Sequence, residues 1–137
     1  MIKILIADDY LPFRLALRDF LETADSRLKI MAEAANGREA LKLVKKTPID
    51  VALIDIRMPI MDGVELSRHI RAIWGHSLAI VTYTGLRSPI LMEQALQAGA
   101  DLHLVKPFEL FALKDAVIRL DESHGRAQTR ARAISVG

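Results

Sequence analysis

Five short apolar runs, each followed by a segment of helical periodicity, constrain the fold of this 137-residue chain more than any other feature. The runs are residues 3–7, 28–32, 51–54, 78–82 or slightly beyond, and 102–105. Most of them are apolar at successive positions, which is typical of parallel strands covered by helices on both faces. Strict alternation of five strands with five helices predicts a single α/β domain, a doubly wound five-stranded parallel sheet with right-handed crossovers and helices on both faces.

The helical segments carry their own boundary signals. Residues that suit helix starts or stops mark most of the ends: Pro12, Asn36, Asp62, Ser88, Pro89 and Gly99. Glu39 and Glu65 stand three residues after the caps Asn36 and Asp62, as in a capping box. The third helix is predicted to bury Leu66, Ile70 and Ile73, and the last is predicted over about 109–120.

Charge is distributed unevenly along the chain. The net charge is +2, but Arg126, Arg130 and Arg132 follow the last acidic residue, Glu122, so residues 1–122 carry a net charge of −1. We therefore predict a domain over residues 1–122 and a basic, flexible tail over 123–137. A near-neutral body without basic residues interleaved with aromatic ones predicts no nucleic-acid binding by this chain.

Two further absences narrow the functional classes. The sequence has no cysteine, which excludes zinc ribbons, thiol catalysis and disulfide frameworks. Asp8 and Asp9 interrupt the N-terminal apolar run, and no segment reaches membrane-spanning length. We expect a soluble cytoplasmic protein that does not enter a membrane.

Charged and hydroxyl side chains follow the predicted strands. They are Asp8 and Asp9 after the first, Asp55 after the third, Thr82 or Thr84 at the fourth, and Lys106 after the fifth. The carboxyl ends of parallel strands form the ligand-binding edge of such sheets. Three neighbouring carboxylates repel one another and need a cation, and Mg²⁺ suits oxygen ligands combined with phosphate.

This arrangement predicts phosphoryl chemistry at Asp55. An ionised carboxylate can act as a nucleophile without a general base, and Mg²⁺ with Lys106 would neutralise the incoming phosphoryl charge. A hydroxyl such as that of Thr84 could donate to a phosphoryl oxygen. The expected product is an aspartyl phosphate.

The stretches ILIADD, LIDIRMPIMDG, QAGAD and LVKPF, with the threonine near the fourth strand, occur in this order. Over roughly residues 2–121 the chain resembles the response-regulator receiver domains of two-component signalling, including those of chemotaxis regulators. The resemblance implies the flavodoxin-like strand order 2-1-3-4-5.

The resemblance also implies roles for individual residues. Asp55 would be the phosphoacceptor, and the metal site would comprise Asp55, Asp9 as a direct ligand, Asp8 largely through water, and the backbone carbonyl of Arg57. Lys106 matches the lysine of the family, usually followed by a cis bond to proline. Spacing from QAG and KPF without gaps selects Thr84 as the switch hydroxyl, with Thr82 as the less favoured choice.

Two positions depart from the family pattern. His103 replaces the usual tyrosine or phenylalanine three residues before the lysine, and we predict that it acts with Thr84 as a switch residue whose protonation biases the switch. Gly85 stands where the family mostly has alanine.

The leading hypothesis is a phosphoacceptor switch that accepts phosphate from a sensor histidine kinase or a phosphotransfer protein and then changes its binding to a downstream partner or an attached output domain. Beyond self-phosphorylation and slow autodephosphorylation, no enzyme activity is expected. The face of the fourth helix, fifth strand and fifth helix would change shape, and two copies could pair through it.

Three alternatives remain open. The chain could be the receiver portion of a longer DNA-binding response regulator, although its end shortly after the fifth helix also suits a stand-alone regulator. A Mg²⁺-dependent phosphohydrolase of the haloacid-dehalogenase type would need a second aspartate two positions after Asp55, where Arg57 stands. A flavodoxin-like FMN module would need a glycine- and hydroxyl-rich first loop, and the sequence there is DDYLP.

Overall fold

The computed structural model describes the backbone of residues 1–136 and the side chains of residues 1–124. Strands and helices alternate strictly along it, as the sequence predicts. Their bounds are β1 Ile2–Ala7, α1 Leu11–Ala24, β2 Leu28–Ala34, α2 Gly37–Lys46, β3 Val51–Asp55, α3 Gly63–Trp74, β4 Ala79–Thr84, α4 Pro89–Gln97, β5 Leu102–Val105 and α5 Leu110–Val136.

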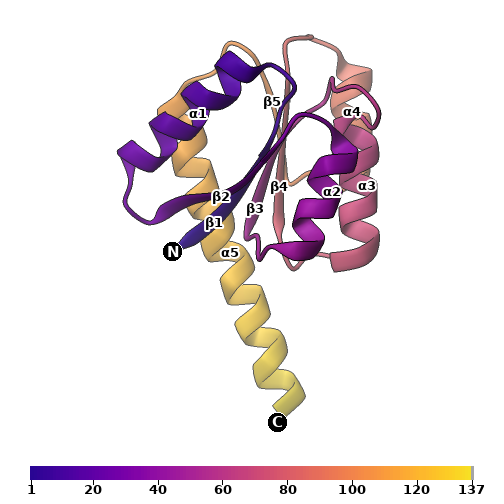
Figure 1. Ribbon diagram of the computed structural model, residues 1–137. Coiled ribbons are helices and arrows are strands. Elements are labelled where there is room, and N and C mark those ends of the chain that lie inside the picture. The colour runs from indigo at the N-terminus through magenta and orange to yellow at the C-terminus, as the bar shows by residue number, and fades with distance from the viewer. Residues whose placement is uncertain (137) are drawn as a thin grey trace.

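The five strands form one parallel sheet in the order β2-β1-β3-β4-β5, which confirms the predicted topology. Helices α1 and α5 cover one face of the sheet, and α2, α3 and α4 cover the other (Figure 1). Successive strand residues point to opposite faces, so Ile4 and Ile6 pack toward α1 and α5 while Leu5 and Ala7 pack toward the other helices. The strands are apolar at successive positions because both faces are buried.

The predicted helix caps are present. The side chains of Asn36, Asp62 and Ser88 accept hydrogen bonds from the backbone N–H three residues on, at 2.9, 2.9 and 3.2 Å. Helix α1 is different, because its N-cap is Tyr10, whose side chain makes no capping hydrogen bond. Neither Asp8 nor Asp9 is therefore the N-cap of α1.

Two predictions about the helices are wrong. Ile73 was predicted to be buried in α3 but is 53% exposed, because the neighbouring Trp74 packs beside the core at this turn. The last helix was predicted to end near Leu120 but continues to Val136. Residues 121–136 contain no proline and only one glycine, so no helix breaker stops it after the core contacts end.

The proposed division at residue 122 is therefore not marked by a helix end. The flexibility predicted for residues 123–137 stays a prediction, since the side chains from residue 125 onward and the backbone of residue 137 lie outside the described part of the chain. Within the described part, no helix combines the length and the apolar character needed to cross a bilayer.

Helix α3 begins in direct contact with the end of β3. A Cβ added to Gly63 would collide with the backbone carbonyl of Asp55 and would lie 2.8 Å from the Cα of Ile56. The Gly63 N–H also donates to the Ile56 carbonyl at 2.8 Å. A side chain at Gly63 would therefore push the helix away from the strand end that carries Asp55.

We predict that Gly63→Ala destabilises the fold by about 1–3 kcal/mol, the usual cost of overpacking. Gly85→Ala is the matched control, because an added Cβ there meets nothing within 4 Å. Urea denaturation of both variants checks the prediction. Equal stability of Gly63→Ala and wild type would show that α3 is not held against β3 at this point.

Candidate functional site

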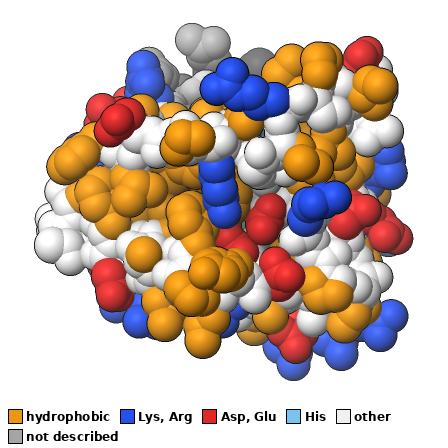
Figure 2. All heavy atoms as spheres, turned by 90° about the horizontal axis from the view of Figure 1, so that it is seen from above, with side chains coloured by type: hydrophobic (Ala, Val, Ile, Leu, Met, Phe, Trp, Pro, Cys, Tyr) orange, Lys and Arg blue, Asp and Glu red, His pale blue; other side chains and the backbone are white. Residues whose placement is uncertain are grey.

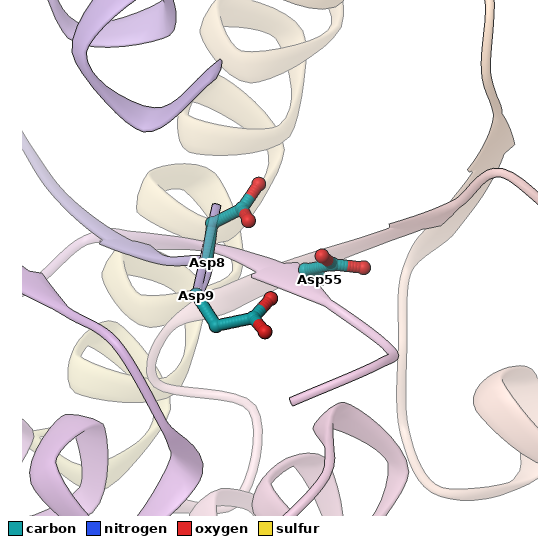
Figure 3. A group of neighbouring side chains, drawn as sticks. All are labelled: Asp8, Asp9 and Asp55. Carbon is teal, nitrogen blue, oxygen red and sulfur yellow. The ribbon is translucent and has the colours of Figure 1, made fainter. Parts of the chain in front are cut away.

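The acidic residues meet where β1 and β3 end side by side. Ala7 of β1 is paired with Ile54 of β3, so Asp8 and Asp9, which follow β1, lie next to Asp55, the last residue of β3. The three side chains lie close together (Figure 3), and one oxygen from each lies within 4.8 Å of the others. Figure 2, which views this end of the molecule, shows acidic side chains gathered near the middle of the face.

Burial makes this cluster electrostatically costly. Asp8 is fully buried and Asp55 is 9% exposed, while Asp9 faces solvent. Burial, followed by the charge of Asp8, raises the pKa of Asp55 to about 7. The Arg57 N–H, which donates to Asp55 Oδ1 at 3.2 Å, and the Lys106 charge act in the opposite direction without cancelling the shift.

The donor set fits a divalent cation such as Mg²⁺. Three carboxylates from two strand ends offer oxygen ligands on one side of a common space, and the exposure of Asp9 leaves room for water and phosphate oxygens. Arg57, two residues after Asp55, has an exposed side chain. The ligand role of its backbone carbonyl stays a prediction.

Asp8 is held from three directions. Its Oδ1 accepts from the Tyr10 N–H at 2.8 Å and its Oδ2 accepts from the Tyr83 hydroxyl at 2.6 Å. Its backbone carbonyl accepts from Arg14 Nη1, also at 2.6 Å. Burial and the charge of Asp8 raise the pKa of Tyr83, so the phenol keeps its proton and remains a donor.

Sequence reasoning missed Tyr83. It lies in the buried strand β4, between Thr82 and Thr84. One feature of the sequence could have indicated its role: it is a tyrosine near the predicted ligand-binding edge. The hydroxyl of a buried tyrosine needs a hydrogen-bond partner, and the carboxylates at that edge are suitable acceptors.

The Lys106 ammonium packs against two aromatic rings next to the site. Its Nζ is 3.7 Å from the ring centroid of Phe13 and 5.1 Å from that of Tyr83. Its charge lowers the pKa of Asp55, but no ion pair with a carboxylate is formed among the side chains that the structure describes. The bond to Pro107 is cis, as the resemblance implies.

The two threonines of β4 point to the sheet face opposite Tyr83 and have different partners. Thr84 Oγ1, at the strand end, accepts from the Leu86 N–H at 3.3 Å. Thr82 Oγ1 lies 2.8 Å from Nδ1 of His103, its neighbour on β5. Because Thr82 is engaged deeper in the sheet, Thr84 is the hydroxyl beside the strand end.

His103 is half buried, and its Nε2 is buried with no hydrogen-bond partner in the described part of the chain. Burial lowers the pKa of His103. The ring is therefore favoured in its neutral form.

The raised pKa of Asp55 predicts a pH-dependent stability. Between its ordinary value of 3.8 and about 7, the folded chain binds more protons than the unfolded chain, so stability is full below this range and is lost as the pH rises through it. Without divalent cations, Asp55→Asn should therefore be closest to wild type in stability near pH 4, around the ordinary pKa of 3.8. Near pH 8 it should exceed wild type by more than about 1 kcal/mol, since one pKa unit corresponds to about 1.4 kcal/mol.

Urea denaturation in a chelating buffer at both pH values measures this difference. A difference in unfolding free energy that does not change with pH would mean that burial and the charge of Asp8 do not raise the pKa of Asp55.

Comparisons with known proteins agree with this geometry. The model of the response regulator receiver domain family matches residues 4–118. The chemotaxis protein CheY of Halobacterium salinarum is 34% identical over 115 residues, which make up 84% of this chain and 92% of that protein. A protein-glutamate methylesterase/protein-glutamine glutaminase of Photobacterium profundum is 37% identical over 111 residues, or 79% of this chain but 27% of that protein.

Solved structures give the same result. The signal receiver domain of the putative response regulator NarL from Mycobacterium tuberculosis has a TM-score of 0.80 and 29% identity, and the match covers 88% of this chain and 96% of that one. The strand order, the acidic strand ends and the matched length lead to one conclusion. This chain belongs to the response regulator receiver domain family of two-component signalling.

Proposed function

We propose that Asp55 accepts a phosphoryl group from the phosphohistidine of a sensor histidine kinase or a phosphotransfer protein, and that this modification changes how the chain binds its partners. The observation that carries the proposal is the meeting of Asp8, Asp9 and Asp55, with one oxygen from each within 4.8 Å of the others. Such a cluster is unfavourable by itself and is completed by a cation and an anion.

Asp55 is the nucleophile of the proposed reaction. Its carboxylate oxygen forms a bond to phosphorus while the bond from phosphorus to the donor's imidazole nitrogen breaks, and the electron pair stays on the imidazole. The attack needs the ionised carboxylate. Mg²⁺ held by Asp8, Asp9, Asp55 and the Arg57 carbonyl would lower the pKa of Asp55 and neutralise charge on the transferred group.

Lys106 and Thr84 are proposed to hold the phosphoryl group. The Lys106 ammonium lies over Phe13 and already stabilises negative charge at Asp55. Its flexible stem allows it to pair with a phosphoryl oxygen as a point charge. The Thr84 hydroxyl, whose contact with the Leu86 N–H is long at 3.3 Å, can turn to donate to another oxygen.

His103 is proposed to couple the site to the partner-binding face. Its ring contacts Thr82, which lies two residues from Thr84 on the same face of β4. A displacement of Thr84 would therefore be transmitted through Thr82 to His103 of β5. The proposed face comprises α4, β5 and α5. Met92 and Leu96 of α4, one helical turn apart, are exposed by 43 and 45%, which favours contact with a downstream protein, an output domain or a second copy.

A role as the receiver portion of a DNA-binding regulator is a second candidate. The transcriptional regulatory protein YdfI of Bacillus subtilis is 35% identical over 122 residues, and the match covers 56% of its length. In that case the phosphoryl group would control an attached domain through the same face. A phosphohydrolase is not favoured, because the exposed Arg57 occupies the position of the required second aspartate.

We predict that acetyl phosphate with Mg²⁺ adds one phosphoryl group to wild type and none to Asp55→Asn. The reason is that only Asp55 combines a carboxylate at the strand end with the neighbouring Lys106 charge. Intact-mass spectrometry measures the addition, and omission of Mg²⁺ is the control. Equal modification of both proteins would place the acceptor elsewhere.

We also predict that acidification destabilises wild type more than His103→Phe. A lowered pKa means that the stability due to His103 is full above its ordinary value of 6.5 and is lost as the pH falls through the folded-state value. Phenylalanine has no such titration, so the stability difference between the two proteins should change between about pH 7.5 and pH 5. Urea denaturation measures it, and parallel pH profiles would remove His103 as a proton-sensitive element.

A further inference from the structure

Tyr83 links strand β4 to the acidic residues at the ends of β1 and β3. It belongs to β4, is paired with Asp55 of β3, and is fully buried. Its hydroxyl donates to Asp8, 75 residues away in the sequence, at 2.6 Å. This is a short hydrogen bond from a neutral donor to a buried carboxylate, the kind that is stronger than an ordinary neutral pair.

The ring of Tyr83 is fixed by its surroundings. The ring centroid of Phe13 lies 5.5 Å from that of Tyr83, with the two rings edge to face. The ring centroid of Phe108 lies 5.9 Å from that of Tyr83, with the two rings tilted. A ring held on two sides has little freedom to turn. The position of its hydroxyl, and with it the position of the Asp8 carboxylate, is therefore set by the packing of α1 and of the segment after β5.

The Asp8 carboxylate is held by donors of this chain at the same time as it faces the other two carboxylates. Tyr10 and Tyr83 each engage a different carboxylate oxygen, and Arg14 engages the backbone carbonyl. One oxygen of the same carboxylate also lies within 4.8 Å of oxygens of Asp9 and Asp55. Two donors behind the carboxylate thus aim it at the position that a cation would occupy.

We propose that Tyr83 is a positioning residue of the metal site, whose hydroxyl fixes the Asp8 carboxylate for a divalent cation. The inference rests on the proposed function, because it takes the acidic cluster to be the Mg²⁺ site. Partners of this kind behind a metal ligand usually contribute roughly tenfold or more to metal affinity.

A purely structural role makes a different prediction. If Tyr83 only fills the space between Phe13 and Phe108, then Tyr83→Phe keeps the ring, its packing and its contact with Lys106, and metal binding stays the same. If the hydroxyl positions Asp8, the same change weakens metal binding even though the fold is kept.

The test is a calorimetric titration of MgCl₂ into wild type, Tyr83→Phe and the control Ser67→Ala. Ser67 is also fully buried, and its hydroxyl donates within α3 to the Gly63 carbonyl at 2.7 Å, so Ser67→Ala removes a buried hydroxyl without touching Asp8. We expect Tyr83→Phe to bind Mg²⁺ about tenfold more weakly than wild type, and Ser67→Ala to bind as wild type does. Unchanged or tighter binding by Tyr83→Phe, or equal weakening in Ser67→Ala, overturns the proposal.

The outcome separates this inference from the proposed function. Absence of Mg²⁺ binding by wild type would overturn both, whereas equal binding by wild type and Tyr83→Phe would overturn only the role of Tyr83.

A second measurement needs no amino-acid substitution among the site residues. In wild type labelled with 3-fluorotyrosine, the ¹⁹F resonance of Tyr83, assigned with Tyr10→Phe, should shift with Mg²⁺ at the calorimetric midpoint. A resonance that does not respond would also contradict the proposal.

Discussion

The repulsion among carboxylates at the ends of β1 and β3 is the constraint on which the site depends. Asp8 is fully buried and Asp55 nearly so, and buried charges are tolerated only with donors or counter-ions. The protein supplies the N–H groups of Tyr10 and Arg57, the hydroxyl of Tyr83 and the nearby charge of Lys106. These groups do not offset the burial of Asp55 and the charge of Asp8, so the pKa of Asp55 is raised to about 7. The site is thus built to be completed by ligands.

The two faces of β4 give this site two sets of connections. Toward α1 and α5, Tyr83 joins Asp8 to the rings of Phe13 and Phe108. The Lys106 ammonium lies over the rings of Phe13 and Tyr83. Toward α2, α3 and α4, the hydroxyl of Thr82 contacts His103 of β5. One short strand therefore contacts both the acidic cluster and the neighbour through which a receiver domain could signal.

Much of the fold and of the acidic cluster could be predicted because their causes are local or general. Caps such as Asn36, Asp62 and Ser88 act within three residues, and unbroken apolar runs require burial on both faces. Parallel strands place their carboxyl ends at one edge, so Asp8, Asp9 and Asp55 were expected together. The two wrong predictions had different causes. The exposure of Ile73 depends on how Trp74 packs beside the core, which is a tertiary contact, whereas α5 continues beyond the core because residues 121–136 hold no proline and only one glycine, which is a local feature.

The sequence by itself determined the alternating elements, the parallel sheet and the acidic edge, since these follow from periodicity, caps and the direction of parallel strands. Tertiary structure alone decided that Tyr83 donates to Asp8, that the ammonium of Lys106 lies over Phe13, and that Thr82 is the partner of His103. Each of these contacts joins segments far apart in the chain. Their geometry depends on strand register and on how helices pack over the sheet, which no local pattern of residues specifies.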